Sequence, residues 1–155
     1  MKDECSKQYP VVGWREWLSL PDLGIDRIKA KIDTGARTSA LHAFFVDPYH
    51  RGAQEWVRFG LHPLQRRTDV AVECDAMVKD RRIVSDSGGH RQWRYVIETR
   101  VVLGPACLNI EITLTDRDPM LFRMLLGRTA LKHGFHIDAG ASYRQGQPAR
   151  HDQWQ

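Results

Sequence analysis

The chain has few cysteines and no long hydrophobic run among its 155 residues. Cys5, Cys74 and Cys107 are widely spaced, so we expect neither a disulfide framework nor a Cys-x-x-Cys metal site. No apolar stretch approaches the roughly 18 residues that a membrane-spanning helix needs, and residues 1–10 lack the apolar core of a signal peptide. The sequence therefore predicts a cytoplasmic protein with no membrane partner, in a compartment that keeps thiols reduced.

The chain also lacks an acidic excess, because 23 Lys and Arg residues outnumber 19 Asp and Glu residues and give a net charge of +4. Seventeen of the basic residues are Arg, whose guanidinium group matches carboxylates and phosphates. An acidic partner is therefore one expectation, and an ordinary soluble surface of small net charge is the other. The basic residues are scattered without an aromatic-interleaved RNA-binding motif, so we do not expect a nucleic-acid partner.

The composition is that of a globular protein, with 42% hydrophobic and 27% charged residues. The length suits one domain, which we place at residues 11–141, between a flexible N-terminus (1–10) and a flexible polar tail (142–155). Short apolar or alternating runs predict strands at Trp14–Leu18, Ile25–Ile32, Leu41–Val46, Trp56–Leu61, Asp69–Val78, Trp93–Leu103, Leu108–Leu114 and Phe135–Ile137. The polar segment Lys79–His90 predicts a mobile hairpin tip or a loop, and Thr129–His133 predicts one short helix. Many short strands with one late helix indicate an all-β barrel or sandwich.

The sharpest motif is Asp33-Thr34-Gly35, directly after the predicted strand Ile25–Ile32. Apolar and basic residues alternate in that strand, which predicts one buried face and one exposed face. A carboxylate at a strand end, followed by a hydroxyl residue and by a glycine that permits a sharp turn, is the arrangement used by aspartic peptidases. Two such carboxylates close together share one proton, so that one activates water while the other protonates the substrate carbonyl.

A second motif, Leu125-Leu126-Gly127-Arg128, precedes the predicted helix. With both motifs, the chain resembles the retropepsin-like aspartic peptidases, in which a strand ending in Asp-Thr-Gly-Ala is paired with a later apolar-apolar-Gly-Arg segment and a short helix. It is similar in particular to a bacterial branch known as ATP-dependent zinc proteases, which is associated with a ribosomal-protein glutamate ligase of the ATP-grasp class. The matching stretches are Val12–Ile32, Asp33–Ala43, Val96–Leu103 and Ile110–Leu131.

The resemblance implies a retropepsin-like closed barrel and an endopeptidase that needs no cofactor. It assigns catalysis to Asp33, with Thr34 and Gly35 as the supporting turn. The residues that it places around a bound peptide are Ala36, Arg37, Leu126, Gly127 and Arg128. As a hypothesis, the two arginines hold substrate carboxylates, and the alternative for Arg128 is an ion pair that locks the helix.

The motif supplies one aspartate, whereas the mechanism needs two carboxylates. A homodimer that pairs Asp33 with its symmetry mate is the first expectation, with an isologous interface. A monomer in which Asp138 or Asp116 supplies the second carboxylate is the alternative. The segment Ile137–Ala141 repeats the Ile-Asp-x-Gly-Ala pattern of Ile32–Ala36, which we attribute to chance.

The zinc of the family name has little support in the sequence. No His-Glu-x-x-His motif is present, and His133, His136 and Asp138 are a conceivable but not an expected ligand set. His42 lies in an apolar run and is expected to pack rather than to bind. The sequence has no phosphate-binding loop, so an ATP requirement would belong to the partner ligase.

The association with a glutamate ligase implies a substrate with an acidic, glutamate-extended C-terminal tail. Basic residues that could steer such a tail are Arg66, Arg67, Arg81, Arg82, Arg91 and Arg94. A non-catalytic adaptor of the same fold, bound to the ribosome or to the ligase, is one alternative function, and a zinc-dependent protease is another. The segment Ser85–His90 is expected to be a plain surface loop, with a flap over the cleft as the alternative.

Overall fold

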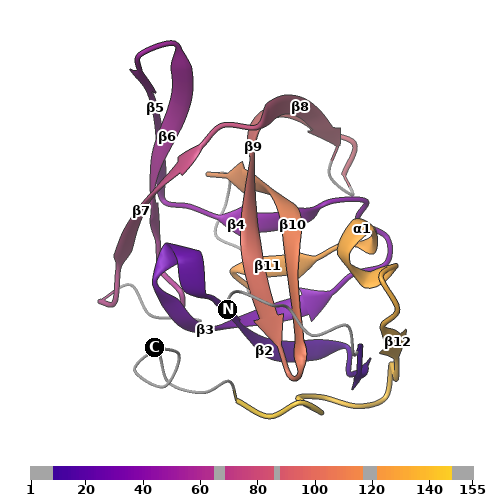
Figure 1. Ribbon diagram of the computed structural model, residues 1–155. Helices are drawn as coiled ribbons and strands as arrows, with labels where there is room; N and C mark the ends of the chain where they lie inside the picture. The colour runs from indigo at the N-terminus through magenta and orange to yellow at the C-terminus, as the bar shows by residue number, and fades with distance from the viewer. Residues whose placement is uncertain (1–8, 65–68, 86–87, 117–121, 148–155) are drawn as a thin grey trace.

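The computed structural model describes residues 9–64, 69–85, 88–116 and 122–147, which form mainly β-strands (Figure 1). The strands are β1 (Val11–Val12), β2 (Arg15–Leu20), β3 (Ile25–Ile32), β4 (Ser39–His42), β5 (Phe45–Arg51), β6 (Gln54–Leu61), β7 (Val72–Met77), β8 (Asp80–Ser85), β9 (Arg91–Leu103), β10 (Ala106–Thr115), β11 (Met124–Leu126) and β12 (His136–Ile137). The helical elements of the described residues are a 3-10 turn at Pro21–Leu23 and the helix α1 (Arg128–Leu131). The predicted all-β class with one short helix near the C-terminus is confirmed.

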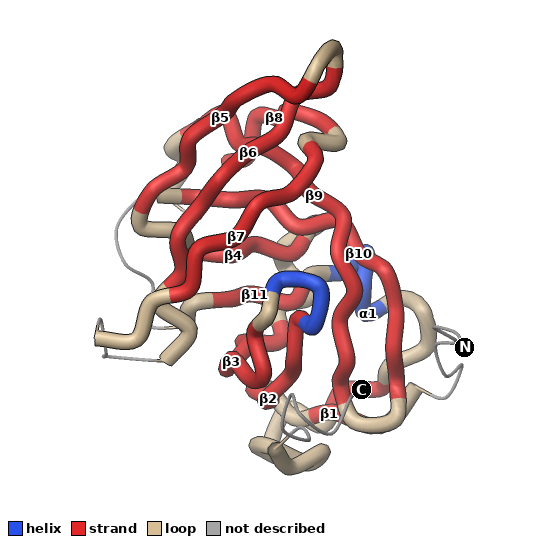
Figure 2. Tube along the Cα trace, turned by 60° about the vertical axis from the view of Figure 1, so that its left-hand side comes forward, coloured by secondary structure: helices blue, strands red, loops and turns tan. Residues whose placement is uncertain are grey.

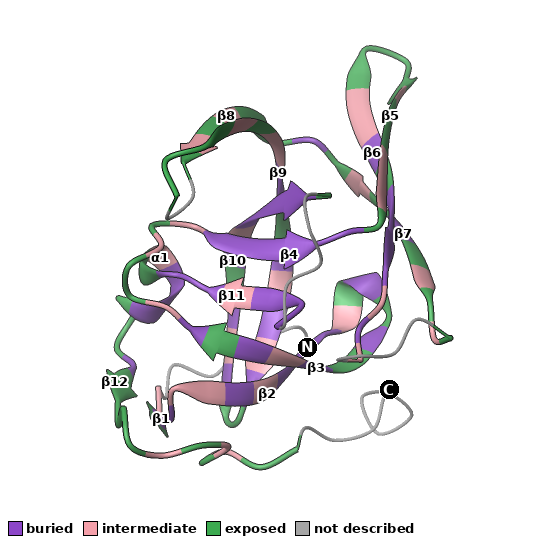
Figure 3. Ribbon diagram, turned by 180° about the vertical axis from the view of Figure 1, so that it is seen from behind, coloured by how far each residue is buried: buried purple, intermediate pink, exposed green. Residues whose placement is uncertain are grey.

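Hydrogen-bonded strands form a ring around the core. The ring runs from β10 through β4, β11, β3, β2 and β9, and it returns to β10 through the β9–β10 pairing. Strand β3 shows why the ring closes on an apolar interior, since Ile28, Ala30 and Ile32 are buried while Arg27 and Lys31 are exposed. Buried residues accordingly lie along the ring strands in Figure 3. The alternation that predicted this strand therefore also predicted its orientation.

Strands β5, β6 and β7 form a separate antiparallel sheet, and the β5–β6 hairpin projects away from the ring (Figures 1 and 2). The predicted single strand Leu41–Val46 is wrong, because β4 ends at His42 and β5 begins at Phe45. The predicted end at Val46 is also wrong, since β5 continues past Pro48 to Arg51. Pro48 is tolerated because β5 is an edge strand that pairs with β6 alone.

The polar segment Lys79–His90 contains β8, although the sequence predicted only a hairpin tip or a loop there. Strand β8 pairs with β9 in antiparallel register, with Asp80 opposite Val96 and Ser85 opposite Arg91. Most of its residues are exposed or half-buried, because β8 lies outside the ring at the edge of the sheet. An edge strand without a buried face carries little hydrophobic alternation, which explains the missed prediction.

Residues 142–147, expected to be part of a flexible tail, are held against β2. The buried carboxylate of Glu16 accepts hydrogen bonds from the backbone N–H groups of Gly13 (2.7 Å), Arg144 (2.9 Å) and Gln145 (3.1 Å). The chain passes so close to Gly13 that a Cβ there would lie 2.3 Å from the carbonyl oxygen of Ala141. Residues 148–155 of the expected tail, and residues 1–8 of the expected N-terminus, lie outside the described part of the chain.

The cysteines differ in their environments. Cys74 is a free thiol, and burial raises its pKa to about 12. Cys107 is disulfide-bonded, which the sequence did not predict. Among the described residues, no helix combines the length and apolar character required to cross a membrane.

Candidate active site

The turn at Asp33 is built by hydrogen bonds on both sides of the residue. Strand β3 delivers Asp33 beside β11, which runs parallel to it with Leu126 opposite Ile32. The Asp33 N–H donates to the carbonyl oxygen of Leu126 at 2.9 Å. The Gly35 N–H in turn donates to the Asp33 Oδ1 at 2.9 Å. The carboxylate is therefore held in a fixed orientation at the end of a strand.

Gly127 allows the second motif to pack against the first. Its N–H donates to the Ser39 Oγ at 2.9 Å. A Cβ at Gly127 would lie 2.7 Å from the carbonyl carbon of Thr38, so a larger residue would displace the backbone. The N–H groups of Arg128 and Thr129 donate to the carbonyl oxygens of Ala36 and Arg37. The start of α1 thus supports the segment that follows Asp33.

Arg128 also supports this turn through its side chain. Its Nη1 donates to the carbonyl oxygen of Thr34 at 2.9 Å. The guanidinium group therefore fixes the backbone between Asp33 and Gly35. Arg128 makes this hydrogen bond to a carbonyl rather than the ion pair that was the alternative for it. This geometry makes Arg128 a positioning residue for the aspartate.

A cavity of about 930 Å³ lies beside Asp33. Its lining residues are Asp33, Gly35, Ala36, Arg37, Thr38, Ala40, Arg82, Ile83, Val84, Ser85, Arg94, Glu111, Thr113, Leu125 and Thr129. Of the predicted site residues, Asp33, Gly35, Ala36 and Arg37 line this cavity. Thr34, Gly127 and Arg128 do not line it and instead shape the turn beside it. Leu126 is only 1% exposed and packs in the core, whereas its neighbour Leu125 lines the cavity.

One wall of the cavity comes from β8, which the sequence analysis had assigned to a loop. The stretch of β8 from Arg82 to Ser85 lines the same cavity as the segment that starts at Asp33. Of the segment Ser85–His90, Ser85 ends β8 and lines the cavity, and residues 88–90 precede β9. Sequence reasoning included Arg82 among the steering residues, but had no signal that it lies in the same cavity as Asp33.

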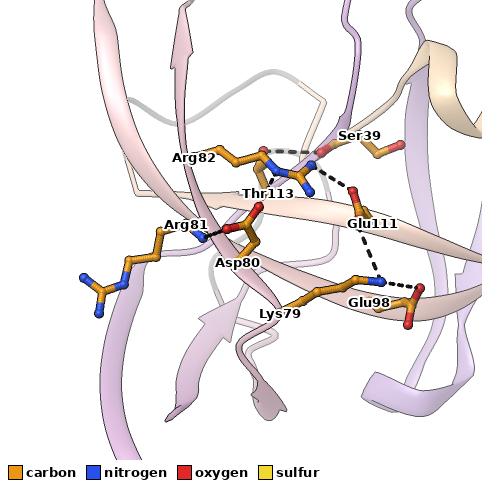
Figure 4. A network of polar contacts seen from close by, with 8 residues as sticks. All are labelled: Ser39, Lys79, Asp80, Arg81, Arg82, Glu98, Glu111 and Thr113. Atoms are coloured by element: carbon orange, nitrogen blue, oxygen red, sulfur yellow. Dashed lines mark hydrogen bonds and ion pairs between the residues drawn. The ribbon is translucent and has the colours of Figure 1, made fainter. Parts of the chain in front are cut away.

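A polar network fixes β8 to β9 and β10 (Figure 4). Arg82 donates from Nη1 to the Glu111 Oε1 and from Nε to the Asp80 Oδ2, each at 2.8 Å. Lys79 bonds Glu98 at 3.1 Å and lies 3.6 Å from Glu111. The hydrogen bond from Arg82 lowers the pKa of Glu111 below its ordinary value and outweighs the opposing effect of partial burial. Glu111 is therefore an ionised carboxylate in the cavity.

The two aspartates considered as partners for Asp33 do not line the cavity. Asp138 accepts a hydrogen bond from the Gly140 N–H at 3.1 Å and pairs with Arg144 at 3.3 Å. This turn repeats the Asp33–Gly35 hydrogen bond at the second Ile-Asp-x-Gly-Ala sequence. Asp116 accepts a hydrogen bond from the Gln92 Nε2. Glu111, which sequence reasoning missed, is the second carboxylate in the cavity lining.

The conceivable zinc ligands are not assembled. Within the described ranges, no group of three or more His, Cys, Asp and Glu side chains is placed to hold a metal ion. His133 stacks on Tyr9 with ring centroids 6.1 Å apart, and His136 pairs with Val11 in the β1–β12 ladder. The described residues therefore do not fit the zinc of the family name. His42 is 5% exposed, in keeping with the packing role expected for it.

Comparison with known proteins places this geometry in a family. Two curated relatives are named "Probable alpha-L-glutamate ligase", one from Shewanella pealeana (41% identical over 137 residues, 88% of this chain and 30% of that protein) and one from Desulfotalea psychrophila (42% over 138 residues, 89% and 29%). The chain thus spans about three tenths of the length of these relatives. A crystal structure of the Legionella pneumophila protein Lpg0085, of unknown function, shares the fold with a TM-score of 0.69 and 22% identity over 89% of this chain and 99% of that one. The model of the RimB-like family, described as "Retropepsin-like aspartic endopeptidase RimB", matches residues 11–148, and the chain belongs to that family.

Proposed function

We propose that this chain is an aspartic-type endopeptidase whose reacting carboxylate is Asp33. The observation that carries the proposal is the placement of Asp33, which is held by the Gly35 N–H at a strand end and faces a cavity of about 930 Å³. Arg128 and Gly127 stabilise the turn from the other side. A pre-oriented carboxylate beside a cavity of this size is suited to positioning a water against a peptide carbonyl.

The second carboxylate is supplied by Asp33 of a partner copy. Glu111 is a poor candidate, because Arg82 holds it ionised with a lowered pKa, whereas a shared proton requires a raised one. Asp138 is engaged by Arg144 and lies outside the cavity lining. A twofold axis beside the Asp33 turn brings two identical carboxylates together in an isologous dimer.

In this dimer the two Asp33 side chains share one proton. The ionised carboxylate removes a proton from water as the water oxygen bonds to the peptide carbon, and the protonated carboxyl gives its proton to the carbonyl oxygen. As the C–N bond of the tetrahedral intermediate breaks, the carboxyl that took the proton from water gives it to the amine nitrogen. A hydroxyl of the intermediate returns its proton to the other carboxylate, so the pair again holds one proton. A shared proton predicts a rate optimum on the acidic side, with apparent pKa values that belong to the pair.

Strand β8 acts as a cover over the bound peptide. Support comes from the cavity wall between Arg82 and Ser85, and from the ion pair that fixes β8 to Glu111 on β10. The flap interpretation of Ser85–His90 is therefore preferred here over the plain surface loop that the sequence favoured. Residues 86–87 of this segment lie outside the described part of the chain.

The substrate is a polypeptide end extended with glutamate, and the partner is the ligase that adds it. Two observations support this assignment. Arg37 is exposed at the cavity and forms no ion pair with another described residue, so its guanidinium group is available for a substrate carboxylate. The curated relatives that contain the matching segment are also named as glutamate ligases.

The test is hydrolysis of matched peptides with and without a glutamate-rich C-terminus, in the presence of a chelator, by wild type and by Asp33→Asn. Asparagine keeps the shape of the side chain and can still accept the Gly35 hydrogen bond, so the fold should be retained. Cleavage by wild type alone is the expected result. Equal cleavage by both proteins would show that Asp33 is only a turn residue, and loss of activity on chelation would support the zinc alternative.

A non-catalytic adaptor is the second candidate. It is favoured by one observation, that the matching segment occupies about 30% of relatives named as ligases. Binding of the ligase without hydrolysis of any glutamate-extended peptide, in the presence of that ligase, would establish it. Hydrolysis that depends on Asp33 would exclude it as the sole function.

A further inference from the structure

The outer face of β2 and β3 carries basic residues that the proposed mechanism does not use. Arg27, Lys29 and Lys31 project from β3, and Arg15 lies opposite Lys31 on β2. Strand β3 leads directly to Asp33, so the row of cations ends two residues before the candidate catalytic carboxylate. Figure 3 marks stretches of these two strands as exposed or half-buried.

These cations have no acidic partners among the described residues. Arg15, Arg27, Lys29 and Lys31 are absent from every ion pair that the described chain forms. By contrast, the basic residues of β8 are paired with Asp80, Glu55 and Glu111. The carboxylate within β3, that of Asp26, is at the opposite end of the strand from Lys31. The outer face therefore has uncompensated positive charge.

Two aromatic rings hold the cations in place. Arg27 and Lys29 lie over the Trp17 ring, 5.4 and 5.2 Å from its centroid. Arg15 and Lys29 lie 4.9 and 5.7 Å from the centroid of the Tyr143 ring. Arg15 also donates from Nε to the Ser142 Oγ at 3.1 Å, and Arg27 donates from Nη1 to the Gln147 Oε1. These contacts restrict the long side chains, while the remaining guanidinium N–H groups and the lysine ammonium groups stay available for hydrogen bonds. The cost of ordering these side chains on binding is thereby reduced.

We propose that this face, made of Arg15, Arg27, Lys29 and Lys31 around Trp17 and Tyr143, is a docking surface for an extended acidic polypeptide. Alternate residues on an extended strand recur at about 6.6 Å. Carboxylates on alternate residues of an extended peptide therefore match the spacing of Arg27, Lys29 and Lys31. The proposal extends the proposed function, because the row directs a bound acidic segment toward the Asp33 turn.

The aromatic rings favour a polypeptide over a single-stranded nucleic acid. Proteins that bind single strands stack bases on open aromatic faces. Here the faces of Trp17 and Tyr143 are approached by the protein's own cations, so a base would first have to displace them. Carboxylates need no open ring, since they bond directly to the ammonium and guanidinium groups.

The proposal is tested by binding of a fluorescein-labelled oligoglutamate peptide, measured by fluorescence anisotropy at low salt. All proteins carry Asp33→Asn, so that the peptide is not consumed and binding is measured apart from catalysis. The test variant adds Arg27→Gln, Lys29→Gln and Lys31→Gln. The control variant adds Arg51→Gln, Arg58→Gln and Lys132→Gln, which remove the same charge from other parts of the surface. Circular dichroism melting checks that both variants fold.

We expect the test variant to bind the peptide at least about tenfold more weakly than the parent protein, and the control variant less than about threefold more weakly. Added salt should weaken the binding of the peptide by the parent protein. Equal losses of peptide affinity in both variants would show that binding depends only on net charge, and would overturn the docking surface. Tighter, Lys31-dependent binding of an oligouridylate of matched charge would overturn the polypeptide as its occupant. If the peptide binds to this face but the wild-type protein hydrolyses no peptide, the docking surface stands and the proposed peptidase activity is rejected.

Discussion

The Nη1 atom of Arg128 donates a hydrogen bond to the carbonyl oxygen of Thr34 at 2.9 Å, across 94 residues of sequence. Thr34 follows the candidate catalytic aspartate, and Arg128 opens the helix α1. The bond connects the two motifs that the sequence analysis singled out. It explains why an arginine directly follows Gly127, since a side chain that is long, charged and planar can reach the carbonyl and stay there.

Replacing Arg128 with lysine or methionine should lower kcat about 10- to 100-fold, because a small displacement of the turn misorients the Asp33 carboxylate. The KM should change little, since Arg128 does not line the cavity. Steady-state kinetics on a cleaved peptide separate the two constants. A raised KM with unchanged kcat would instead restore the substrate-binding role that the sequence analysis considered.

Replacing Gly127 with alanine should destabilise the protein by about 1–3 kcal/mol, the usual cost of overpacking. The added Cβ would lie 2.7 Å from the carbonyl carbon of Thr38 and 2.9 Å from the Ser39 nitrogen, and both are backbone atoms. Gly140→Ala is the matched control, because the added Cβ there would meet its nearest atom, the Asp138 Oδ1, at an ordinary 3.6 Å. Urea denaturation compares them, and equal stability of the two variants would show that the backbone at Gly127 yields easily.

Replacing Glu16 with glutamine should cost about 1–3 kcal/mol in the free energy of unfolding. Glu16 is fully buried and its two oxygens accept three backbone hydrogen bonds. The amide nitrogen of glutamine cannot accept and would face a backbone N–H. Glu98→Gln, at an exposed ion pair with Lys79, should cost less than about 1 kcal/mol.

Limited proteolysis gives a second measurement for Glu16. Loss of the Arg144 and Gln145 hydrogen bonds should release residues 142–147, so that the variant is cleaved at Arg144 faster than wild type. Equal cleavage rates would show that other contacts hold this segment.

Replacing Glu111 with glutamine should change how stability depends on pH. The hydrogen bond from Arg82 lowers the pKa of Glu111 in the folded protein below its ordinary value of 4.5. The stabilisation is therefore complete above that value and is lost as the pH falls through the folded-state pKa. Wild type should melt about 2–4 °C higher than the variant near neutral pH, and the difference should shrink at acidic pH.

The control for this pH series is Glu73→Gln, which removes an ion pair with Arg58 in which both side chains are more than half exposed. Its melting temperature should stay close to that of wild type throughout, because solvent screens exposed pairs. If the difference in melting temperature between wild type and Glu111→Gln stays constant with pH, the ionisation of Glu111 does not contribute to stability.

The strand at Ile25–Ile32 and the turn at Asp33 were predicted because their signals are local. Alternation of apolar and basic residues defines which face of β3 is buried, and Asp-Thr-Gly encodes the turn through side-chain and backbone chemistry within three residues. Gly127 and the helix after it were likewise recognisable from contiguous residues. These features depend little on the rest of the chain.

The missed elements depend on neighbours that are distant in sequence. Strand β8 has no buried face, so only its pairing with β9 makes it a strand. Pro48 is admitted because β5 is an edge strand, a position set by the tertiary arrangement. Residues 142–147 are polar, and the buried acceptor that orders them, Glu16, lies more than 120 residues earlier.

The sequence by itself determined the β-rich class and the position of Asp33 at a strand end, because periodicity and turn chemistry act over a few residues. The resemblance to the family came from the two motifs, Asp33-Thr34-Gly35 and Leu125-Leu126-Gly127-Arg128. Only the tertiary structure decided that Arg82 and Glu111 share the cavity with Asp33 and that Arg128 supports its turn. It also decided that Trp17 and Tyr143 gather the cations of β2 and β3. Those contacts join residues far apart in the chain, and the closure of the ring brings them together.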